Sequence, residues 1–564
     1  MPMSRAEMPL AGEGAPEPRR PVPDEARPGR RRNLLIFLTI LAYLYFRGIG
    51  DHGLLDPLEG VNASVGLTMA THGDLLHPGV GEAPYAGRAM GTWWLYALAL
   101  KAFGWEEFAV RFWPAAAGLG MALAAALASR GRGAWIAAAV SASMVMGFTV
   151  SHLASSHALY ACCTAMSMAA FVRLQRGEGR RWALLAHAGA LAALVVQGPE
   201  GLLLPWVVPI LHSMLTSRFG PLALCWRHWP AALISLAGVS GYVALLAAQN
   251  PMILTLMLYE APPLLRPGGM LSLLFILVSV VPWPGLVVRA VTGAVPRSLE
   301  SLQGEEPTPR FFLVLWAFVF AFFAVMMGDY LSMAAAVPPL AALVGDSLDE
   351  WIAEGRVGEV QRAVALNIVI IVPLAVLGLP LALRAIPGLD SAMLSLVPWL
   401  SFVALCVAAG WYYARTRQLL KFARNVSAAA LLCLMPLTGV FDLLAEDGAI
   451  RDVGLALRGS VQRGDVIVQY AVNRPSMYFY TLRNYAMVNA PLVPGLTRQR
   501  GASLSDTALH LLWEDYGRAF LMIPRNQQLS APLPGEVNAL MEDDGMVVLS
   551  NRSAPLGAGS LSAR

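Results

Sequence analysis

The chain has 564 residues, of which 56% are hydrophobic and 14% are charged, and its mean hydropathy is +0.55. Soluble globular domains carry roughly 25% charged and about 45–50% apolar residues, so this composition excludes an ordinary soluble protein. The formal net charge of +4 says little about partners, and no nucleic-acid partner is expected. The five cysteines lie in or beside apolar runs without a C-x-x-C pair, so they predict neither a zinc site nor a disulfide framework.

Residues 1–32 predict a disordered cytoplasmic tail, because they are rich in Pro, Gly, Glu and Arg and lack an apolar period. The tail ends in a group of arginines directly before the apolar run 33–46. No small-residue cleavage site follows this run, so it indicates a retained signal anchor.

The rest of the chain up to residue 445 contains many long apolar runs, and a transmembrane helix needs about 20 such residues. The sequence predicts about thirteen spans, at 33–49, 109–128, 134–151, 157–173, 182–196, 200–216, 229–248, 270–289, 311–328, 331–346, 363–385, 392–413 and 425–444. Arginines fall almost entirely in alternate loops, which by the positive-inside rule places the N-terminal tail in the cytoplasm and everything after residue 445 outside. The predicted fold class is therefore a membrane all-α domain over 33–445, followed by a small extracytoplasmic α/β domain over 446–564.

Two segments are predicted to lie outside the membrane. The first external loop, 50–108, mixes apolar and polar stretches with several aromatic residues, which favours short helices along the membrane surface. In the C-terminal segment, three predicted strands alternate with helical stretches at 475–484 and 505–514, which is typical of a small α/β domain. The strands are DVIVQYAV (465–472), GRAFLMIP (517–524) and GMVVLSN (545–551), and the extreme end is expected to be disordered.

Several polar residues of the first loop could carry chemistry. They are Asp56, Glu59, Asp74, His77 and Glu82, which accompany Arg88. Taken alone, these residues are equally well explained as solvated loop positions. Four histidines are also predicted to lie outside, but their spacings match no metal-binding signature, so no metal site is expected. These histidines are His72, His77, His152 and His157.

The first external loop resembles that of the GT-C glycosyltransferases of family 39, which include the protein O-mannosyltransferases and the lipid A aminoarabinose transferase. The resemblance rests on LLDPLEGVNASVGLTMATHGDLLHP (54–78) and PYAGRAMGTWWLYALALKAFGWEEFAVR (84–111), in which Glu59 precedes Gly73-Asp74 by the fourteen residues typical of the family. Three later segments are also similar to family elements and extend the resemblance from residue 33 to about 551. They are QGPEGLLLP (197–205), VVPWPGLV (280–287) and DYLSMAAAVPPLAAL (329–343).

This resemblance implies a GT-C fold in the bacterial cytoplasmic membrane and sugar transfer, without a cofactor, from a polyprenyl-phosphate donor. The acceptor would be a lipid, a glycan or a protein on the outer face. Arg88 holds the position of the family's phosphate-binding lysine, and Arg266 is a second candidate contact of the carrier phosphate, although a plain interfacial arginine explains it equally well. The resemblance further places Tyr85, Trp94 and Tyr330 in the substrate cavity.

The chain departs from the family at its catalytic positions. Leu58 stands where the family has its catalytic aspartate, and His157 stands near the place of the second external carboxylate. Because leucine cannot accept a proton, the candidates for the catalytic base are Asp56, then Glu59, then His157. A histidine at a helix end is more often a structural hydrogen-bonding residue, so that explanation of His157 stays open.

The lost aspartate leaves two functions in competition. The first is an active glycosyltransferase, and the second is a non-catalytic relative that binds a lipid-linked sugar or supports the assembly of envelope glycans. A transporter is disfavoured, because the sequence has neither repeated halves nor paired broken helices.

Overall fold

A computed structural model describes residues 30–85, 90–249, 275–296, 298, 309–378, 380, 393–432, 434–446, 450–491, 504–542 and 545–553. The chain divides into two compact units, residues 1–43 and 44–564, and helix α1 (Arg30–Phe46) crosses the boundary between them. The predicted N-terminal tail lies almost entirely outside the described residues.

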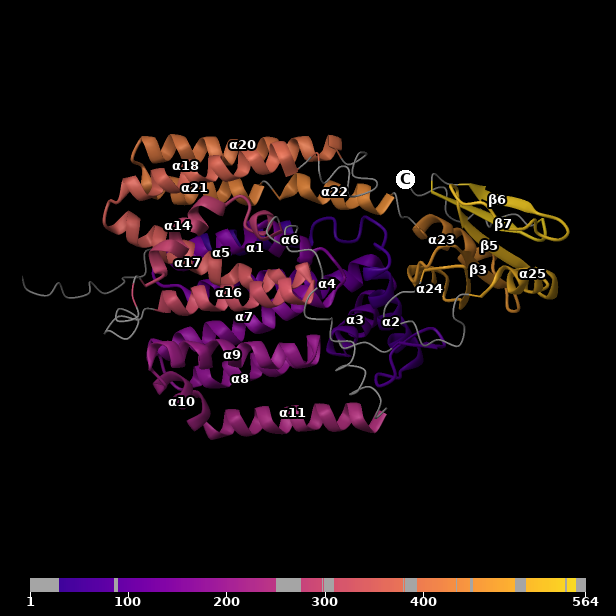
Figure 1. Ribbon diagram of the computed structural model, residues 1–564, viewed down its shortest axis with the longest axis horizontal. Coiled ribbons are helices and arrows are strands. Elements are labelled where there is room, and N and C mark those ends of the chain that lie inside the picture. Colours follow the sequence, from indigo (N-terminus) through magenta and orange to yellow (C-terminus); the bar gives the residue numbers. More distant parts are fainter. Residues whose placement is uncertain are drawn as a thin grey trace, which may run out of the picture. The chain divides into compact units, whose positions relative to one another are not determined.

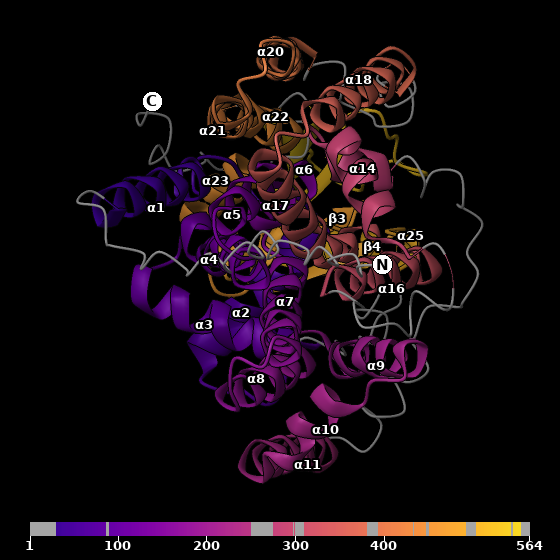
Figure 2. The same cartoon turned by 90° about the vertical axis from the view of Figure 1, so that its left-hand side faces the viewer.

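The apolar runs of the second unit form a bundle of helices, which lie side by side in Figure 1 and are viewed along their axes in Figure 2. The helices after the first loop are α4 (Glu107–Ala128), α5 (Gly133–Ser143), α6 (Val145–Ser151), α7 (Ser156–Gln175), α8 (Arg181–Gln197), α9 (Pro199–Thr216), α10 (Gly220–Arg227), α11 (Trp229–Gln249), α14 (Pro284–Ala294), α16 (Pro309–Met327), η1 (Tyr330–Ala336), α17 (Val337–Ala353), α18 (Val357–Pro373), η2 (Leu374–Gly378), α20 (Met393–Arg415), α21 (Leu419–Leu432) and α22 (Met435–Glu446).

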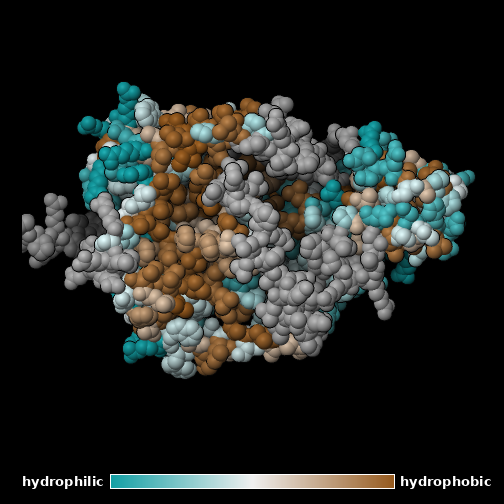
Figure 3. Space-filling model, in the orientation of Figure 1, coloured by the Kyte–Doolittle hydropathy of each residue, from teal (hydrophilic) through white to brown (hydrophobic). Residues whose placement is uncertain are grey.

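Among the described residues, seven helices are long and apolar enough to cross a membrane, or eight if the bent pair α5 and α6 is one span. All seven overlap predicted spans, and Figure 3 shows a broad hydrophobic surface on the bundle. The protein is therefore a multi-pass membrane protein. The number thirteen stays a prediction, because α8 is short and part of the predicted span 270–289 lies outside the described residues.

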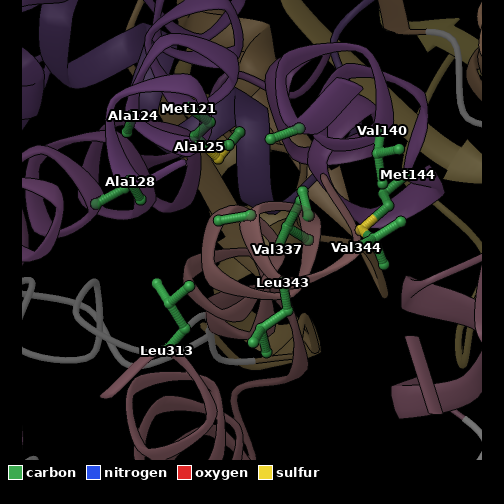
Figure 4. Close-up of a cluster of buried hydrophobic side chains, with 14 of the residues drawn as sticks. Met121, Ala124, Ala125, Ala128, Val140, Met144, Leu313, Val337, Leu343 and Val344 are labelled. Atoms are coloured by element: carbon green, nitrogen blue, oxygen red, sulfur yellow. The ribbon is translucent and has the colours of Figure 1, made fainter. Parts of the chain in front are cut away.

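Small side chains allow the central helices of the bundle to approach closely. Helix α17 packs against α4 and α5 through small and medium-sized residues such as Ala125, Val140 and Val344, which Figure 4 shows. A Cβ atom added at Gly345 of α17 would lie 2.5 Å from the carbonyl oxygen of Gly133 of α5. Such close contact of small residues is how membrane helices gain packing energy in the absence of a hydrophobic driving force.

The first loop contains helices α2 (Leu58–His72) and α3 (Met90–Phe103) with a two-stranded turn between them, β1 (Gly79–Val80) and β2 (Ala83–Pro84). The short helices predicted for this loop are thus present. Helix α2 packs against α3 on one side and against helix α24 (Ser476–Thr481) of the C-terminal segment on another.

The C-terminal segment forms a five-stranded sheet in the order β4-β3-β5-β7-β6. Strand β3 pairs in parallel with β4 and β5, whereas β7 pairs antiparallel with β5 and β6. The strands predicted from the sequence are β3 (Val466–Tyr470), β5 (Ala519–Pro524) and β7 (Met546–Ser550). The structure also contains three elements that were not predicted, which are strands β4 (Tyr485–Val488) and β6 (Asn538–Glu542) and helix α23 (Ile450–Ser460). Helix α25 (Asp506–Asp515) matches the second predicted helix.

Direct hydrogen bonds hold this segment against the first loop. The backbone N–H of Leu54 donates to the Tyr480 hydroxyl at 2.9 Å, and the Ser64 hydroxyl donates to the Pro475 carbonyl at 2.8 Å. These contacts lie at the end of the bundle where α4 and α7 begin, which is called the sheet end below. The opposite end, where α4 and α7 finish, is called the arginine end.

Candidate functional site at the sheet end

A buried ion pair joins the first loop to the bundle. Glu59, on the first turn of α2, and Arg111, on the first turn of α4, are both fully buried and form two hydrogen bonds of 2.6 and 2.9 Å. The Arg111 guanidinium also donates to the carbonyls of Ile49, His52 and Gly53, so all five of its N–H groups have partners. This saturation satisfies two buried charges that would be very costly alone.

Glu59 also fixes the turn that precedes α7. Its carboxylate accepts hydrogen bonds from the backbone N–H groups of Ala154 at 2.6 Å and Leu55 at 2.9 Å. Although burial opposes the charge, Arg111 and these N–H groups hold the pKa of Glu59 below its ordinary value. The Tyr96 hydroxyl of α3 donates to the Ser155 carbonyl of the same turn at 3.0 Å. The two loop helices therefore set where α7 begins.

His157, on the first turn of α7, pairs with Asp329, which stands between α16 and η1. Its Nε2 atom lies 3.0 Å from Oδ1 and 3.2 Å from Oδ2 of Asp329, and its Nδ1 atom lies 3.1 Å from the Ser155 hydroxyl. The Ser332 hydroxyl donates to Asp329 Oδ2 at 2.6 Å. Burial alone would raise the pKa of Asp329, but the His157 charge and the hydrogen bonds from His157 and Ser332 hold it well below its usual range.

The local sequence explains why Asp329 reaches His157. Helix α16 is followed by Gly328, whose φ of +66° belongs to the left-handed region that glycine adopts at no steric cost. The backbone N–H of Asp329 then bonds back to the Ala324 carbonyl at 3.0 Å, which turns the chain away from the helix. The Asp329 side chain is 34% exposed and that of His157 only 11%, so the carboxylate is the outward member of the pair.

The Gln-Gly-Pro-Glu segment (197–200), which spans the junction of α8 and α9, lies beside the same pair. The Ser156 hydroxyl donates to Gln197 Oε1 at 2.7 Å, and Gly198 has a φ of +110° at the junction of the two helices. Tyr160 of α7 interacts electrostatically with both Glu200 and Asp329. Residues from α7, α8, α9 and η1 thus meet in one polar group at the sheet end.

Asp56 lies on the other side of α2 and faces the C-terminal segment. Its carboxylate accepts hydrogen bonds from the backbone N–H of Ser476 at 3.0 Å and from the Ser476 hydroxyl. Burial raises the pKa of Asp56 to about 6, although the Ser476 hydrogen bonds and the Arg474 charge oppose this change. Asp56 therefore connects the loop to the sheet-bearing segment.

The three aromatic residues predicted for the substrate cavity occupy two places. Tyr85 packs edge-on against Trp93 with ring centroids 5.3 Å apart, and the Trp94 indole donates to the Leu75 carbonyl at 2.7 Å, so both stay within the first loop. Tyr330 follows Asp329 directly and stacks on Phe275 with centroids 4.9 Å apart. Tyr330 therefore belongs to the His157–Asp329 side of the sheet end.

Comparisons with known proteins agree with this architecture. Residues 63–254 match the family of dolichyl-phosphate-mannose-protein mannosyltransferases. The crystal structure of ArnT from Cupriavidus metallidurans in the apo state superposes with a TM-score of 0.73 and 16% identity, over 93% of this chain and 98% of that one. The structure of the same ArnT bound to undecaprenyl phosphate gives equal values and covers 99% of that chain. No curated protein matches the chain in sequence.

The chain has the ArnT fold. The resemblance predicted from the first loop is thereby confirmed, and the matched family segment runs from α2 through α11 into the residues beyond. The ArnT fold includes the C-terminal segment of this chain, since the superposition extends over nearly all of both proteins.

Two predicted phosphate contacts, Arg88 and Arg266, lie outside the described residues. Of the four histidines considered together, His77 bonds to Asp74 at 2.8 Å, His72 and His152 contact backbone carbonyls, and His157 contacts Asp329. Within the described ranges no three His, Cys, Asp or Glu side chains are grouped as a metal site would require.

Sequence reasoning missed Asp329, although the segment that it opens was recognised as similar to the family. A signal was present: an ionisable residue directly after an apolar run is costly at a membrane boundary and marks a functional position more often than a neutral residue does. Nothing in the sequence, however, pairs positions 157 and 329.

Proposed function

We propose that this protein is a membrane glycosyltransferase, which moves a sugar from a polyprenyl-phosphate donor to a lipid, glycan or protein acceptor. The reaction would take place at the sheet end, on the outer face of the bacterial cytoplasmic membrane. One observation carries the proposal: the chain shares its fold, over almost its whole length, with an ArnT that has been crystallised with undecaprenyl phosphate.

The chemistry of this transfer needs two kinds of group. A base must accept the proton of the acceptor hydroxyl as its oxygen attacks the anomeric carbon. Cations must hold the phosphate that leaves, and arginine suits this role because its planar fork binds phosphate through two hydrogen bonds. We assign the phosphate contacts to Arg88 and Arg266, as the sequence resemblance implies, with Tyr85, Trp94 and Tyr330 along the substrate cavity.

The contacts of Asp56 and Glu59 support positioning roles in the proposed enzyme. Each Glu59 oxygen accepts two hydrogen bonds, so the carboxylate has no lone pair left for a substrate proton. Asp56 is turned toward Ser476. Asp56 and Glu59 therefore fix the loop around the site. Of the three bases predicted from the sequence, His157 is the one that lies in the polar group formed by α7, α8, α9 and η1.

A second candidate function is that of a non-catalytic relative that binds a lipid-linked sugar. Leu58, at the position of the family's catalytic aspartate, favours it, because its side chain is partly exposed at the start of α2 and has no group that accepts a proton.

Transfer by the purified full chain in lipid nanodiscs, with a panel of polyprenyl-phosphate sugars and mixed acceptors, tests the proposal by mass spectrometry of the products. We expect release of free polyprenyl phosphate coupled to a glycosylated acceptor. Arg88→Ala should weaken carrier binding by more than about tenfold, because a hydrogen bond to a charged group contributes roughly 1.5–3 kcal/mol. Binding of undecaprenyl phosphate without transfer from any donor would favour the non-catalytic function instead.

A further inference from the structure

The carboxylates at the sheet end differ in the hydrogen bonds that they already accept from the protein. Glu59 is saturated by Arg111 and two backbone N–H groups, and Glu107 accepts from Arg451 at 3.0 Å and from the Tyr480 hydroxyl at 3.1 Å. Asp56 is occupied by Ser476. A base for glycosyl transfer must instead keep an oxygen available on the open side of the site.

We propose that Asp329 is the catalytic base of this protein and that His157 is the residue that positions it. This assignment rests on the proposed function. It replaces the aspartate missing at Leu58 by a carboxylate from a different element, the junction of α16 and η1. Neither the family motif of the first loop nor the fold similarity assigns a role to Asp329.

The geometry of the pair carries this assignment. The imidazole of His157 contacts both carboxylate oxygens, and the hydroxyl of Ser332 donates to Oδ2. About a third of the Asp329 side chain is exposed, so the carboxylate can still accept a hydrogen bond from a substrate. Two fixed partners hold the carboxylate in one orientation, and such preorganisation is what a proton-transfer geometry requires.

The arrangement also keeps the base ionised. Because His157 and Ser332 stabilise the charged form, the pKa of Asp329 stays well below its usual range, although burial opposes this. A carboxylate of low pKa is a weak base toward a free alcohol. During transfer, however, the acceptor hydroxyl becomes acidic as its oxygen bonds to the anomeric carbon, and carboxylates act as general bases in glycosyl chemistry for this reason.

The proposed step balances in atoms and charge. The acceptor oxygen forms a bond to the anomeric carbon, and the bond between that carbon and the donor phosphate oxygen breaks. The electron pair of the broken bond leaves with the polyprenyl phosphate, and the acceptor proton moves to Oδ1 of Asp329. Release of that proton to water restores the carboxylate for the next turnover.

Replacement of Asp329 tests the assignment directly. Asp329→Asn should lower transfer by at least about 100-fold, the usual contribution of a general base, while undecaprenyl phosphate binding stays unchanged. The matched control is Asp349→Asn, because Asp349 is another carboxylate that pairs with a basic side chain, Arg132, but lies near the end of α17 with a quarter of its side chain exposed. Transfer by the control should equal that of the unmodified protein. Full activity of Asp329→Asn would overturn the proposal.

A second variant covers the case in which Asp329→Asn fails to fold. In Asp329→Ala, added formate can occupy the space of the lost carboxylate and accept the proton in its place. Formate should therefore restore part of the transfer by Asp329→Ala and leave the transfer by Asp349→Ala unaffected. A folded Asp329→Ala protein, confirmed by its binding of undecaprenyl phosphate, that formate does not restore would assign Asp329 a structural role and overturn the proposal.

The pH profile of transfer tests the role of His157, because replacement of a purely structural residue would not shift this profile. In His157→Gln the amide still donates a hydrogen bond, but the cationic partner is lost, so the pKa of Asp329 should rise toward its ordinary value. The acid limb of the pH profile of transfer should then move to higher pH. Tyr160 of α7 also interacts electrostatically with Asp329, and it is unchanged in this variant. An unmoved acid limb would contradict the positioning role.

The two proposals fail in different ways. If the unmodified protein transfers no sugar from any donor, the proposed function fails, and the assignment of Asp329 falls with it. If the unmodified protein is active and Asp329→Asn is equally active, only the assignment of Asp329 fails and the function stands.

Discussion

The Glu59–Arg111 pair should be the most sensitive polar contact of the sheet end. Removing one partner of a buried ion pair leaves an uncompensated charge and costs about 3–5 kcal/mol. Arg111→Lys should be nearly as harmful as Arg111→Ala, because a lysine ammonium has three donors on one atom and cannot reach Glu59 and three separate carbonyls. We expect both variants to lower the apparent melting temperature in detergent strongly.

The control for this measurement is Arg132→Ala, which breaks a pair with Asp349 in which half of the arginine side chain is exposed. Exposed pairs contribute roughly 0–1 kcal/mol, so its melting temperature should stay close to that of the unmodified protein. A stable Arg111→Lys protein would show that the carbonyl contacts of Arg111 are dispensable.

The sequence predicted individual site residues unevenly. Asp56 and Glu59 were chosen as candidates because they lie in the first loop, and His157 because it lies at the start of a predicted span. In the structure, His157 contacts Asp329. The positioning function inferred for Glu59 was not predictable, because its partners lie 52 and 95 positions along the chain. A single sequence contains no information on such long-range pairs, whereas the types of residue that carry charge at a membrane surface are visible in it.

The contact between the first loop and α24 should depend on pH through Asp56. The pKa of this carboxyl is raised from 3.8 to about 6, so the folded protein favours the protonated form. Asp56 therefore contributes stability that is complete below about pH 4 and is lost as the pH rises through about 6. The apparent melting temperature of the unmodified protein should therefore fall, relative to that of Asp56→Asn, as the pH rises from about 4 to about 7.

The asparagine variant serves as the reference because its amide keeps a hydrogen-bond acceptor for Ser476 and does not titrate. Parallel melting curves of the two proteins across this pH interval would show that Asp56 is not buried against Ser476. A difference of the opposite sign would show that the contact favours the ionised carboxylate.

Strands and helices of the C-terminal segment show how far local pattern predicts an element. Strands β3, β5 and β7 come from continuous apolar runs and were predicted within a few residues. Strand β6, with the sequence NALME, carries residues of low β propensity and forms because β7 offers it a partner, with a bulge between Ala539 and Met541. Its existence depends on tertiary pairing, which the local sequence does not contain.

The two ends of the bundle differ in charge, because the arginines of the inter-helix loops are concentrated at the arginine end. At the arginine end, guanidinium groups pair with carboxylates, as in Arg132 with Asp349 of α17 at 3.0 Å and Arg173 of α7 with Glu178 at 2.6 Å. Hydrophobic side chains cover the helices between this end and the sheet end, as Figure 3 shows. The same division appeared in the sequence as arginines confined to alternate loops, so the basic pattern that sets orientation survives in the folded arrangement.

The orientation of the whole protein follows from this division and is the broadest prediction. Because loops rich in arginine stay in the cytoplasm, the arginine end and the N-terminal tail should lie inside, and the sheet end with residues 446–564 should lie outside. Alkaline phosphatase is active only outside the cytoplasm, so a fusion after Gly131, between α4 and α5, should be inactive, and a fusion after Gly464, beyond α23, should be active. A green fluorescent protein fused at the same two positions should give the reverse pattern, and a reporter at residue 30 should behave like the one at Gly131. Equal activity at Gly131 and Gly464 would place the arginine end and the sheet end on the same side of the membrane, which would contradict the predicted orientation.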